Sequence, residues 1–280
     1  MSIIDWAAFT MPITYTESPP SEYVFRERVQ QVTKDLLRIL PTIMNYVIDD
    51  LQPTTAQRPY RRCYLCPNTG MRINCDPARR EALIVFNGGA CETVTKMGQD
   101  ALRELLLAVS DSGTRLDIAT DVPTELGVRA VSDAGWSKRI KSTSLIMSSM
   151  GETLYIGSRK SNAFARVYRY LAPHPRARLL RIEHELKKDQ ARSVAAVAAI
   201  HGVELAQRSV ADKFSYQHPE VKKLFAGTIR DITTERTQRT LARTEIWLMT
   251  QAAPAFQKLV REGVIEDPRD WVNRYMLGDI

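Results

Sequence analysis

Three short stretches of this chain alternate polar and apolar residues, and this pattern constrains the fold more than any other feature. Side chains two residues apart in a β-strand point to the same face. The stretches are residues 114–122, 153–170 and 179–186, and the second is predicted to be a hairpin that turns near residues 158–162. In each stretch one face collects charged and tyrosine side chains: Arg115, Asp117 and Asp121; Arg166, Tyr168 and Tyr170; Arg181, Glu183 and Glu185.

If these strands are neighbours, the shared face combines carboxylates, arginines and tyrosines. Carboxylate oxygens are the ligands that Mg²⁺ or Mn²⁺ prefers. A tyrosine beside them could attack phosphorus, and arginines could hold a phosphate through paired hydrogen bonds. The alternative is an ordinary solvated sheet face whose charges form cross-strand pairs. The residues alone leave both interpretations open.

The rest of the chain predicts strands mixed with helices, which indicates an α+β fold with a central antiparallel sheet flanked by helices. Apolar residues at three- and four-residue spacings predict helices over residues 22–51, broken at Pro41, and over 94–109. A long helix is predicted over 187–214, with an interruption at Gly202. Further strands are predicted over 3–15, 60–75 (a hairpin that turns at residues 67–70) and 82–87, with residues 52–59 as a loop.

The pair His218-Pro219 marks a boundary, and the chain is predicted to divide near it. Residues 1–215 are expected to form the catalytic domain, and residues 216–280 a helical C-terminal segment with stops at Pro254 and Pro268. Arginines lie between the apolar residues of this segment. It could therefore contact DNA or a second subunit, or simply pack on the first domain.

Positive charge is concentrated in two parts of the chain. The net charge is +7 over 280 residues. The first basic stretch, residues 58–80, has six Arg and one Asp, and the second, residues 152–192, has ten Lys or Arg and four Asp or Glu. Such clusters can neutralise phosphates, which favours a nucleic-acid partner over a merely solvated basic surface. No uncharged apolar run is long enough for a membrane span, and residues 1–16 lack a signal peptide's basic region, so we expect a cytoplasmic protein without a membrane partner.

The four cysteines and four histidines offer weaker candidates for chemistry. Cys63 and Cys66 form one close pair, but Cys75 and Cys91 do not form a second, so we expect reduced cysteines in strands rather than a zinc site. His184 has the opposite parity to Glu183 and is predicted to be structural or exposed.

Five motifs in the same order resemble the rolling-circle replication initiation factors of plasmids and filamentous phages, the Rep_trans type, and the related nicking relaxases of conjugative elements. The resemblance covers residues 1–192, about two-thirds of the chain. The matching pieces are residues 4–10 (IDWAAFT), 86–91 (FNGGAC), 114–121 (TRLDIATD), 152–161 (ETLYIGSRKS) running into 166–168 (RVY), and 181–187 (RIEHELK).

The resemblance implies a metal-dependent, site-specific DNA endonuclease that initiates rolling-circle replication of a phage or plasmid. The family's nucleophilic tyrosine falls on Tyr168, which would form a 5′-phosphotyrosine adduct and release a 3′-hydroxyl. The family usually has a lysine where this chain has Tyr170, so a second tyrosine joins the catalytic face, either for a second transfer or only as a sheet-face aromatic. The implied ligands of Mg²⁺ or Mn²⁺ are Asp117, Asp121, Glu183 and Glu185, and the implied DNA contacts are Arg115, Arg159, Lys160, Arg166 and Arg181.

The expected partners follow from this activity. They are replication-origin DNA in single-stranded or hairpin form, a host helicase and polymerase, and a second copy in a homodimer. Tyr155 is the rival nucleophile, because it lies on the hairpin arm that pairs with the arm of Tyr168. The rival functions are a conjugative relaxase with the same chemistry, a DNA-binding regulator that keeps the fold but does not nick, and a structural protein with a basic surface.

Overall fold

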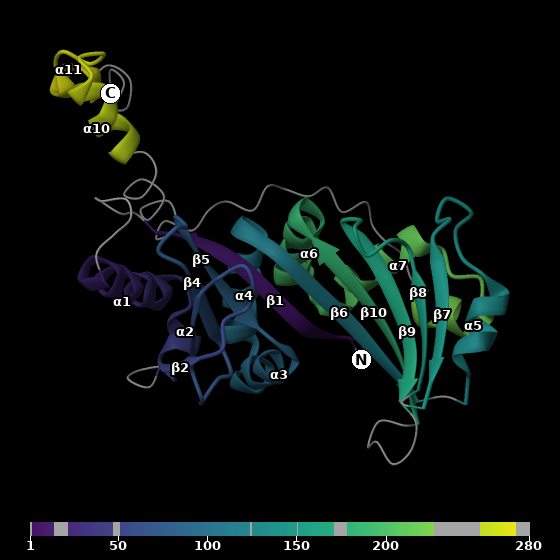
Figure 1. The fold of residues 1–280 in the computed structure, drawn as a ribbon. Helices are drawn as coiled ribbons and strands as arrows, with labels where there is room; N and C mark the ends of the chain where they lie inside the picture. The colour runs from purple at the N-terminus through teal and green to yellow at the C-terminus, as the bar shows by residue number, and fades with distance from the viewer. Residues whose placement is uncertain are drawn as a thin grey trace.

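A single ten-stranded antiparallel sheet organises the protein in the computed structural model (Figure 1). The structure describes residues 2–13, 22–46, 51–123, 125–149, 151–170, 178–226 and 253–272. The strand order is β2-β3-β4-β5-β1-β6-β10-β9-β8-β7. The strands are β1 (Ser2–Pro12), β2 (Gln52–Thr54), β3 (Arg62–Leu65), β4 (Arg72–Cys75), β5 (Glu81–Phe86), β6 (Gly113–Pro123), β7 (Thr143–Ser148), β8 (Gly151–Ile156), β9 (Ala163–Tyr170) and β10 (Leu179–Lys187).

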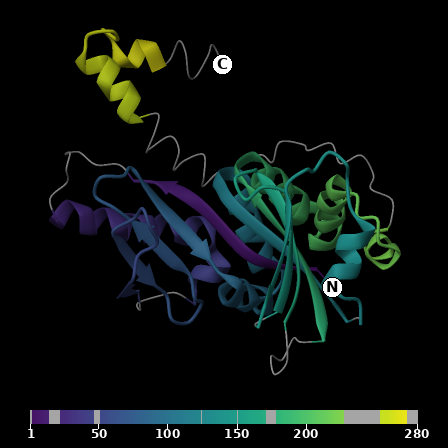
Figure 2. The same ribbon diagram turned by 45° about the vertical axis from the view of Figure 1, so that its right-hand side comes forward.

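Helices cover the apolar face of the sheet, and the predicted α+β class is confirmed. Leu116 and Ile118 of β6 and Ile182 of β10 are completely buried, and His184 of β10 contacts Phe214 of α7 on the same face. Figure 2 shows α6 and α7 together on one side of the strands. The helices are α1 (Glu22–Ile39), α2 (Pro41–Met44), α3 (Gly88–Met97), α4 (Gln99–Ser112), α5 (Val128–Ala134), α6 (Lys188–His201), α7 (Val203–Phe214), α8 (Pro219–Leu224), α10 (Ala253–Arg261) and α11 (Pro268–Val272).

Strand β1 joins the two halves of the sheet. Its residues Ala7–Pro12 pair with β5, and residues 2–9 pair with β6 on the other side. The register with β6 shifts between Ile4 and Trp6. An extra residue in one strand of a pair re-aims the side chains beside it. This irregularity brings both Asp5 and Trp6 to the side of the sheet that carries the polar residues of β6.

Most predicted breaks and turns lie where the sequence placed them. The helix predicted over 22–51 ends at Ile39, and α2 starts at Pro41. The two predicted hairpins are β3–β4 and β8–β9, and Gly202 separates α6 from α7 with a φ of +90°. Residues 14, 15 and 47–50 of the predicted elements lie outside the described residues.

Four local predictions are wrong, and each has a physical reason. The helix predicted over 94–109 is two helices, because Gly98 takes a φ of +115° between them. Gly88 and Gly89 begin α3 rather than only end a strand, since the Asn87 side chain accepts a hydrogen bond from the Ala90 amide and caps the helix. The predicted loop at 52–59 contains β2, which pairs with β3. Pro254 and Pro268 are in the first turns of α10 and α11 rather than at helix ends, because proline's missing N–H costs nothing there.

The sequence analysis missed two elements at one end of the sheet, α5 and β7. Every residue of β7 is exposed, including Leu145, Ile146 and Met147. β7 pairs with β8 and is the last strand of the sheet. The chain from Ser142 to Ser149 has no charged side chain. The strand β7 itself is therefore uncharged and carries exposed apolar side chains, and Arg129 of α5 contacts it by donating to Met147 Sδ at 2.7 Å.

Residues beyond the predicted boundary at 215/216 pack on the same core. Tyr216 and Val221 are buried in it, and the ring centroids of Tyr216 and His184 are 6.0 Å apart. The division of the chain at this point stays a prediction. Among the described residues, no helix is long and apolar enough to cross a membrane.

Candidate active site

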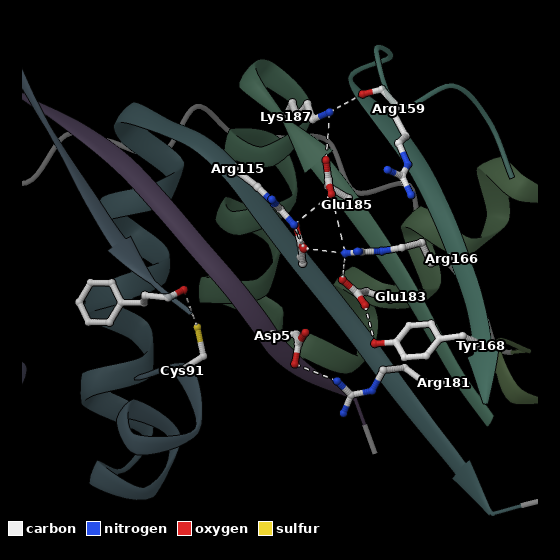
Figure 3. A network of polar contacts seen from close by, with 12 residues as sticks. Asp5, Cys91, Arg115, Arg159, Arg166, Tyr168, Arg181, Glu183, Glu185 and Lys187 are labelled. Atoms are coloured by element: carbon white, nitrogen blue, oxygen red, sulfur yellow. Dashed lines mark hydrogen bonds and ion pairs between the residues drawn. The ribbon is translucent and has the colours of Figure 1, made fainter. Parts of the chain in front are cut away.

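The three strands with polar faces are neighbours in the sheet, in the order β6-β10-β9. The register aligns their polar residues in rows that run across the strands. One row joins Asp117, Glu185 and Phe164, the next joins Glu183 and Arg166, and the third joins Asp121, Arg181 and Tyr168. Residues directly opposite on one face have Cβ atoms about 4.5–5.5 Å apart, so each row brings its side chains into contact. The polar side chains that alternate along each strand in the sequence therefore lie together on one face of the sheet (Figure 3).

Asp117, Glu183 and Glu185 form a buried carboxylate cluster that two arginines bind. Arg115 donates to both oxygens of Asp117, at 2.8 and 2.5 Å, and its Nη2 lies 3.0 Å from Glu185 Oε2. Arg166 Nη2 donates to Glu183 Oε1 and, at 3.3 Å, to Asp117 Oδ2. The side chains of Asp117 and Glu183 are each only 2% exposed, whereas the arginines are 30% and 27% exposed. The arginines thus cover the carboxylates on the solvent side.

Burial sets the acid–base properties of this cluster. The pKa of Asp117 is raised to about 7, mainly by burial and further by the charges of Glu183 and Glu185, while Arg115 opposes the shift. Burial by itself lowers the pKa of Arg166, but the surrounding carboxylates raise it above its ordinary value overall. Both arginines therefore stay charged, and Asp117 can hold a proton near neutral pH.

The carboxylate oxygens converge on one cationic atom. Arg166 Nη2 accounts for contacts to all three residues, with Glu185 Oε2 at 3.7 Å in addition to the bonds to Asp117 and Glu183. A set of carboxylate oxygens around one positive centre suits a hard divalent cation. In the part of the chain that the structure describes, no group of three or more acidic, His or Cys side chains is arranged to hold a metal ion. The carboxylates are the donor type that Mg²⁺ or Mn²⁺ prefers, but here Arg166 occupies the point on which their oxygens converge.

Tyr168 lies at the edge of the carboxylate cluster. Its hydroxyl donates to Glu183 Oε2 at 2.9 Å, while Glu183 Oε1 accepts from Arg166. Glu183 therefore connects the tyrosine to the cluster, as Figure 3 shows. Tyr170 ends β9 opposite Gly151, and its side chain lies outside what the structure describes.

Asp121 belongs to a separate group centred on Arg181. Arg181 donates to both oxygens of Asp121, at 2.6 and 2.7 Å, and to Asp5 Oδ1 at 2.9 Å. Burial lowers the pKa of Arg181, but the hydrogen bonds to Asp121 and the other charges raise it well above its ordinary value. Of the four residues predicted as metal ligands, three gather around Arg166, and Asp121 pairs with Arg181 instead.

The sequence analysis did not identify Asp5 as a site residue. The only signal was its place in the stretch 4–10, which resembles the family's opening strand. A Cβ at residue 88 would lie 3.3 Å from Asp5 Oδ1, so glycine at this position lets α3 approach the Asp5 side chain closely. The register shift in β1 and this glycine together place Asp5 beside Arg181.

The remaining predicted DNA contacts lie at the β8–β9 turn. The guanidinium of Arg159 stacks 4.4 Å from the ring centroid of Tyr155, and Lys160 is exposed. Lys187, which was not predicted, donates to the Arg159 carbonyl oxygen at 2.5 Å and lies 3.0 Å from Glu185 Oε1. Lys187 therefore connects the β8–β9 turn to the carboxylate cluster.

His184 is structural, and it lies on the opposite face of β10 from the carboxylates. It is fully buried, with Nδ1 3.2 Å from Gln207 Oε1 and Nε2 3.0 Å from the Tyr216 hydroxyl. Gln207 continues the network by donating to Thr120 Oγ1 at 3.1 Å. The network ties β10 and β6 to α7 directly behind the site. Burial lowers the pKa of His184 to about 4, so this histidine is neutral.

The four cysteines are free, as predicted, and all are buried. Cys63 and Cys75 lie in strands, whereas Cys66 follows the end of β3 and Cys91 lies in α3. Its thiol donates to the Phe86 carbonyl oxygen at 3.4 Å, and burial raises its pKa well above the ordinary value. A buried thiol with a raised pKa is a poor nucleophile and a poor metal ligand.

Comparison with known proteins supports the fold. No protein-family model and no curated protein sequence matches the chain. Among solved structures, the chain is similar to a rolling-circle replication initiator protein from Geobacillus stearothermophilus. The TM-score is 0.56 at 16% sequence identity, and the match covers 90% of this chain and 96% of that chain. The fold of this chain is therefore similar to that of the Geobacillus stearothermophilus protein.

Proposed function

We propose that this protein initiates rolling-circle replication of a phage or plasmid by nicking one strand of its origin DNA with Tyr168. The observation that carries the proposal is the 2.9 Å hydrogen bond from the Tyr168 hydroxyl to Glu183, within a buried cluster of carboxylates and arginines. A tyrosine that already donates to a carboxylate has a proton acceptor in place for its activation. The fold shared with a known initiator supports the same conclusion.

In the proposed reaction, the Tyr168 oxygen forms a bond to the scissile phosphorus as the bond from phosphorus to the 3′ oxygen breaks. The phenolic proton passes to Glu183, and the leaving 3′ oxygen takes up a proton and becomes a 3′-hydroxyl that can prime a polymerase. The products are a 5′-phosphotyrosine adduct and a free 3′ end. Arg115 and Arg166 are close enough to the tyrosine's cluster to bind the phosphate oxygens once these side chains turn outward.

Asp117, Glu183 and Glu185 are the residues that would hold Mg²⁺ or Mn²⁺, with Asp121 as a more distant candidate. The bound ion supplies positive charge that stabilises the non-bridging phosphate oxygens as the bond order changes. Arg166 must leave the carboxylates for this to happen, and the phosphate of the DNA offers it a new partner. The arginine thereby links occupancy of the carboxylates to the presence of DNA.

Arg159, Lys160 and Arg181 complete the proposed DNA contacts, and origin DNA in single-stranded or hairpin form is the proposed substrate. A host helicase, a polymerase and a second copy of the chain are the further partners that such a reaction requires or permits. Residues 216–280 are proposed as a helical extension of the catalytic domain.

The test is formation of a covalent protein–DNA adduct. Supercoiled DNA of the replicon that encodes the protein is incubated with Mg²⁺ or Mn²⁺, and the product is examined for protein joined to a 5′ end and for a 3′ end that a polymerase extends. Tyr168→Phe should abolish the adduct and leave DNA binding nearly unchanged, because it removes only the hydroxyl oxygen.

Tyr170→Phe is the matched control and should still form the adduct. If Tyr168→Phe forms it, the nucleophile is Tyr170 or Tyr155 and the assignment is wrong. If the wild-type protein forms none with either metal, a DNA-binding regulator that keeps this fold without nicking becomes the better conclusion.

A further inference from the structure

Two aromatic side chains border the carboxylate cluster, and each is stacked with an arginine. The Arg115 guanidinium lies 4.7 Å from the centroid of the Trp6 ring, and the Arg159 guanidinium lies 4.4 Å from that of Tyr155. Both rings are only half-buried. Large aromatic rings on a polar sheet face are not needed for the core, which lies on the other face of β6 and β10.

The two aromatic residues lie on opposite sides of the cluster. Trp6 is directly opposite Asp117 on β1, and Tyr155 is directly opposite Arg166 on β8. The strands β1, β6, β10, β9 and β8 are consecutive in the sheet. Four strand spacings of about 4.8 Å separate Trp6 from Tyr155 by roughly 19 Å across the sheet. In strand order, Tyr168 and the three carboxylates lie between them, and Tyr168 is two residues farther along β9 than Arg166, the residue opposite Tyr155.

We propose that this face of the sheet is a platform for single-stranded DNA, on which Trp6 and Tyr155 each stack an unpaired nucleobase on either side of the scissile phosphate. The inference rests on the proposed function and deepens it, because it adds two residues that would bind the bases of the unpaired strand. Bases stack on aromatic rings and on guanidinium planes alike, so a base can extend either arginine–aromatic pair. A duplex keeps its bases stacked on one another and offers no free ring face.

Charge on this face favours the same ligand. The Arg115 guanidinium supplies positive charge beside Trp6. Arg159, Lys160 and Lys187 add positive charge beside Tyr155. Bases on the rings and phosphates on the cations are the two components of sequence-tolerant binding to a single strand. The platform would hold the strand flat across β6, β10 and β9, with a phosphate over Tyr168.

The experiment measures binding without cleavage. All variants are made in the Tyr168→Phe background and are assayed without divalent metal, against a labelled dT oligomer, an oligomer of equal length made of abasic nucleotides, and a duplex. Trp6→Ala and Tyr155→Ala should each weaken binding of the dT oligomer by roughly 5- to 150-fold, the usual range for loss of one stacked base. Trp6→Phe and Tyr155→Phe should retain most of the affinity.

Two controls separate stacking from folding and from charge. Tyr64→Ala removes a half-buried aromatic of the same sheet on β3, far from the cluster in strand order, and should not change the affinity. The abasic oligomer keeps the phosphates, so it should bind weakly to the parent protein and equally to the Trp6 and Tyr155 variants. A protein whose other tryptophans are replaced (Trp136→Phe, Trp247→Phe and Trp271→Phe) should show quenching of Trp6 fluorescence by the dT oligomer.

Equal binding of the dT and abasic oligomers by the parent protein would overturn the inference, as would alanine variants that bind like the parent. Quenching by the abasic oligomer equal to that by dT would overturn it as well. Because the assay uses a dT oligomer without divalent metal and measures binding alone, its outcome is independent of the nicking assay. A protein that fails to nick can still bind the dT oligomer through Trp6 and Tyr155, and a protein that nicks can lack this binding.

Discussion

Acid should destabilise this protein through one buried side chain, His184. Its pKa is lowered from 6.5 to about 4 by burial, and its ring nitrogens contact Gln207 and Tyr216. The unfolded chain therefore binds a proton that the folded chain does not bind between these two pH values. By linkage, stability is fully present above pH 6.5 and falls as the pH decreases toward 4.

The size of this effect follows from the difference between the two pKa values. One pKa unit corresponds to about 1.4 kcal/mol, so the full contribution is about 3 kcal/mol, most of which is lost between pH 7.5 and pH 4.5. Urea unfolding at the two pH values measures it. His184→Gln cannot be protonated and should lose about 2–3 kcal/mol less than the wild type over this interval, although it is less stable at pH 7.5 because Tyr216 loses its partner.

His201 is the matched control, because it is an exposed histidine at the end of α6. His201→Gln should leave the pH dependence of the unfolding free energy as it is in the wild type. If wild type and His184→Gln lose the same free energy between pH 7.5 and pH 4.5, the buried neutral histidine does not cause the acid sensitivity and the reasoning fails.

Three further predictions concern the site and its surroundings. The affinity for DNA should fall steeply as NaCl is titrated, because the two basic stretches release counterions, and a flat response would show that they do not contact the backbone. Arg166→Met leaves three buried carboxylates without their central cation, so it should lower the free energy of unfolding in EDTA by about 3 kcal/mol. Addition of Mn²⁺ should restore the stability. A loss of stability that Mn²⁺ does not reverse would argue against a metal position at these carboxylates. Gly157→Ala should lower the free energy of unfolding by about 1–2 kcal/mol, measured by heat or urea, because residue 157 has a φ of +97° and its new Cβ would lie 3.3 Å from Phe164 Cβ. The control Gly127→Ala, at a φ of −82° with open space around it, should leave the stability nearly unchanged.

Much of the site could be predicted from the sequence, because parity along a strand is local information. Alternation shows which polar residues share a face within each strand, but not that the strands of Asp117, Arg166 and Glu183 are neighbours. The sequence could not show which residues are opposite one another. The separation of Asp121 from the other carboxylates depends on the register of β6 against β10.

The sequence could not predict the contact between Asp5 and Arg181 for a related reason. Asp5 and Arg181 are 176 residues apart, and their contact depends on a register shift in β1 that no local pattern reveals. The helix break at Gly98 was missed because the apolar period continues across it. α5 has only seven residues, and β7 has no alternation of buried and exposed side chains, since all its residues are exposed.

The open edge at β7 has a consequence for how this protein behaves at high concentration. An edge strand without charge, proline or a covering element offers its backbone to any other extended segment. Thr143–Ser148 has no charge of its own and can pair with a copy of itself in the antiparallel sense, so the sheets of two molecules could join end to end once the Arg129 side chain turns away from Met147. A lysine in place of Ile146 would put a repelling charge at the centre of such a junction, and light scattering of concentrated samples would show whether the native edge is what brings molecules together.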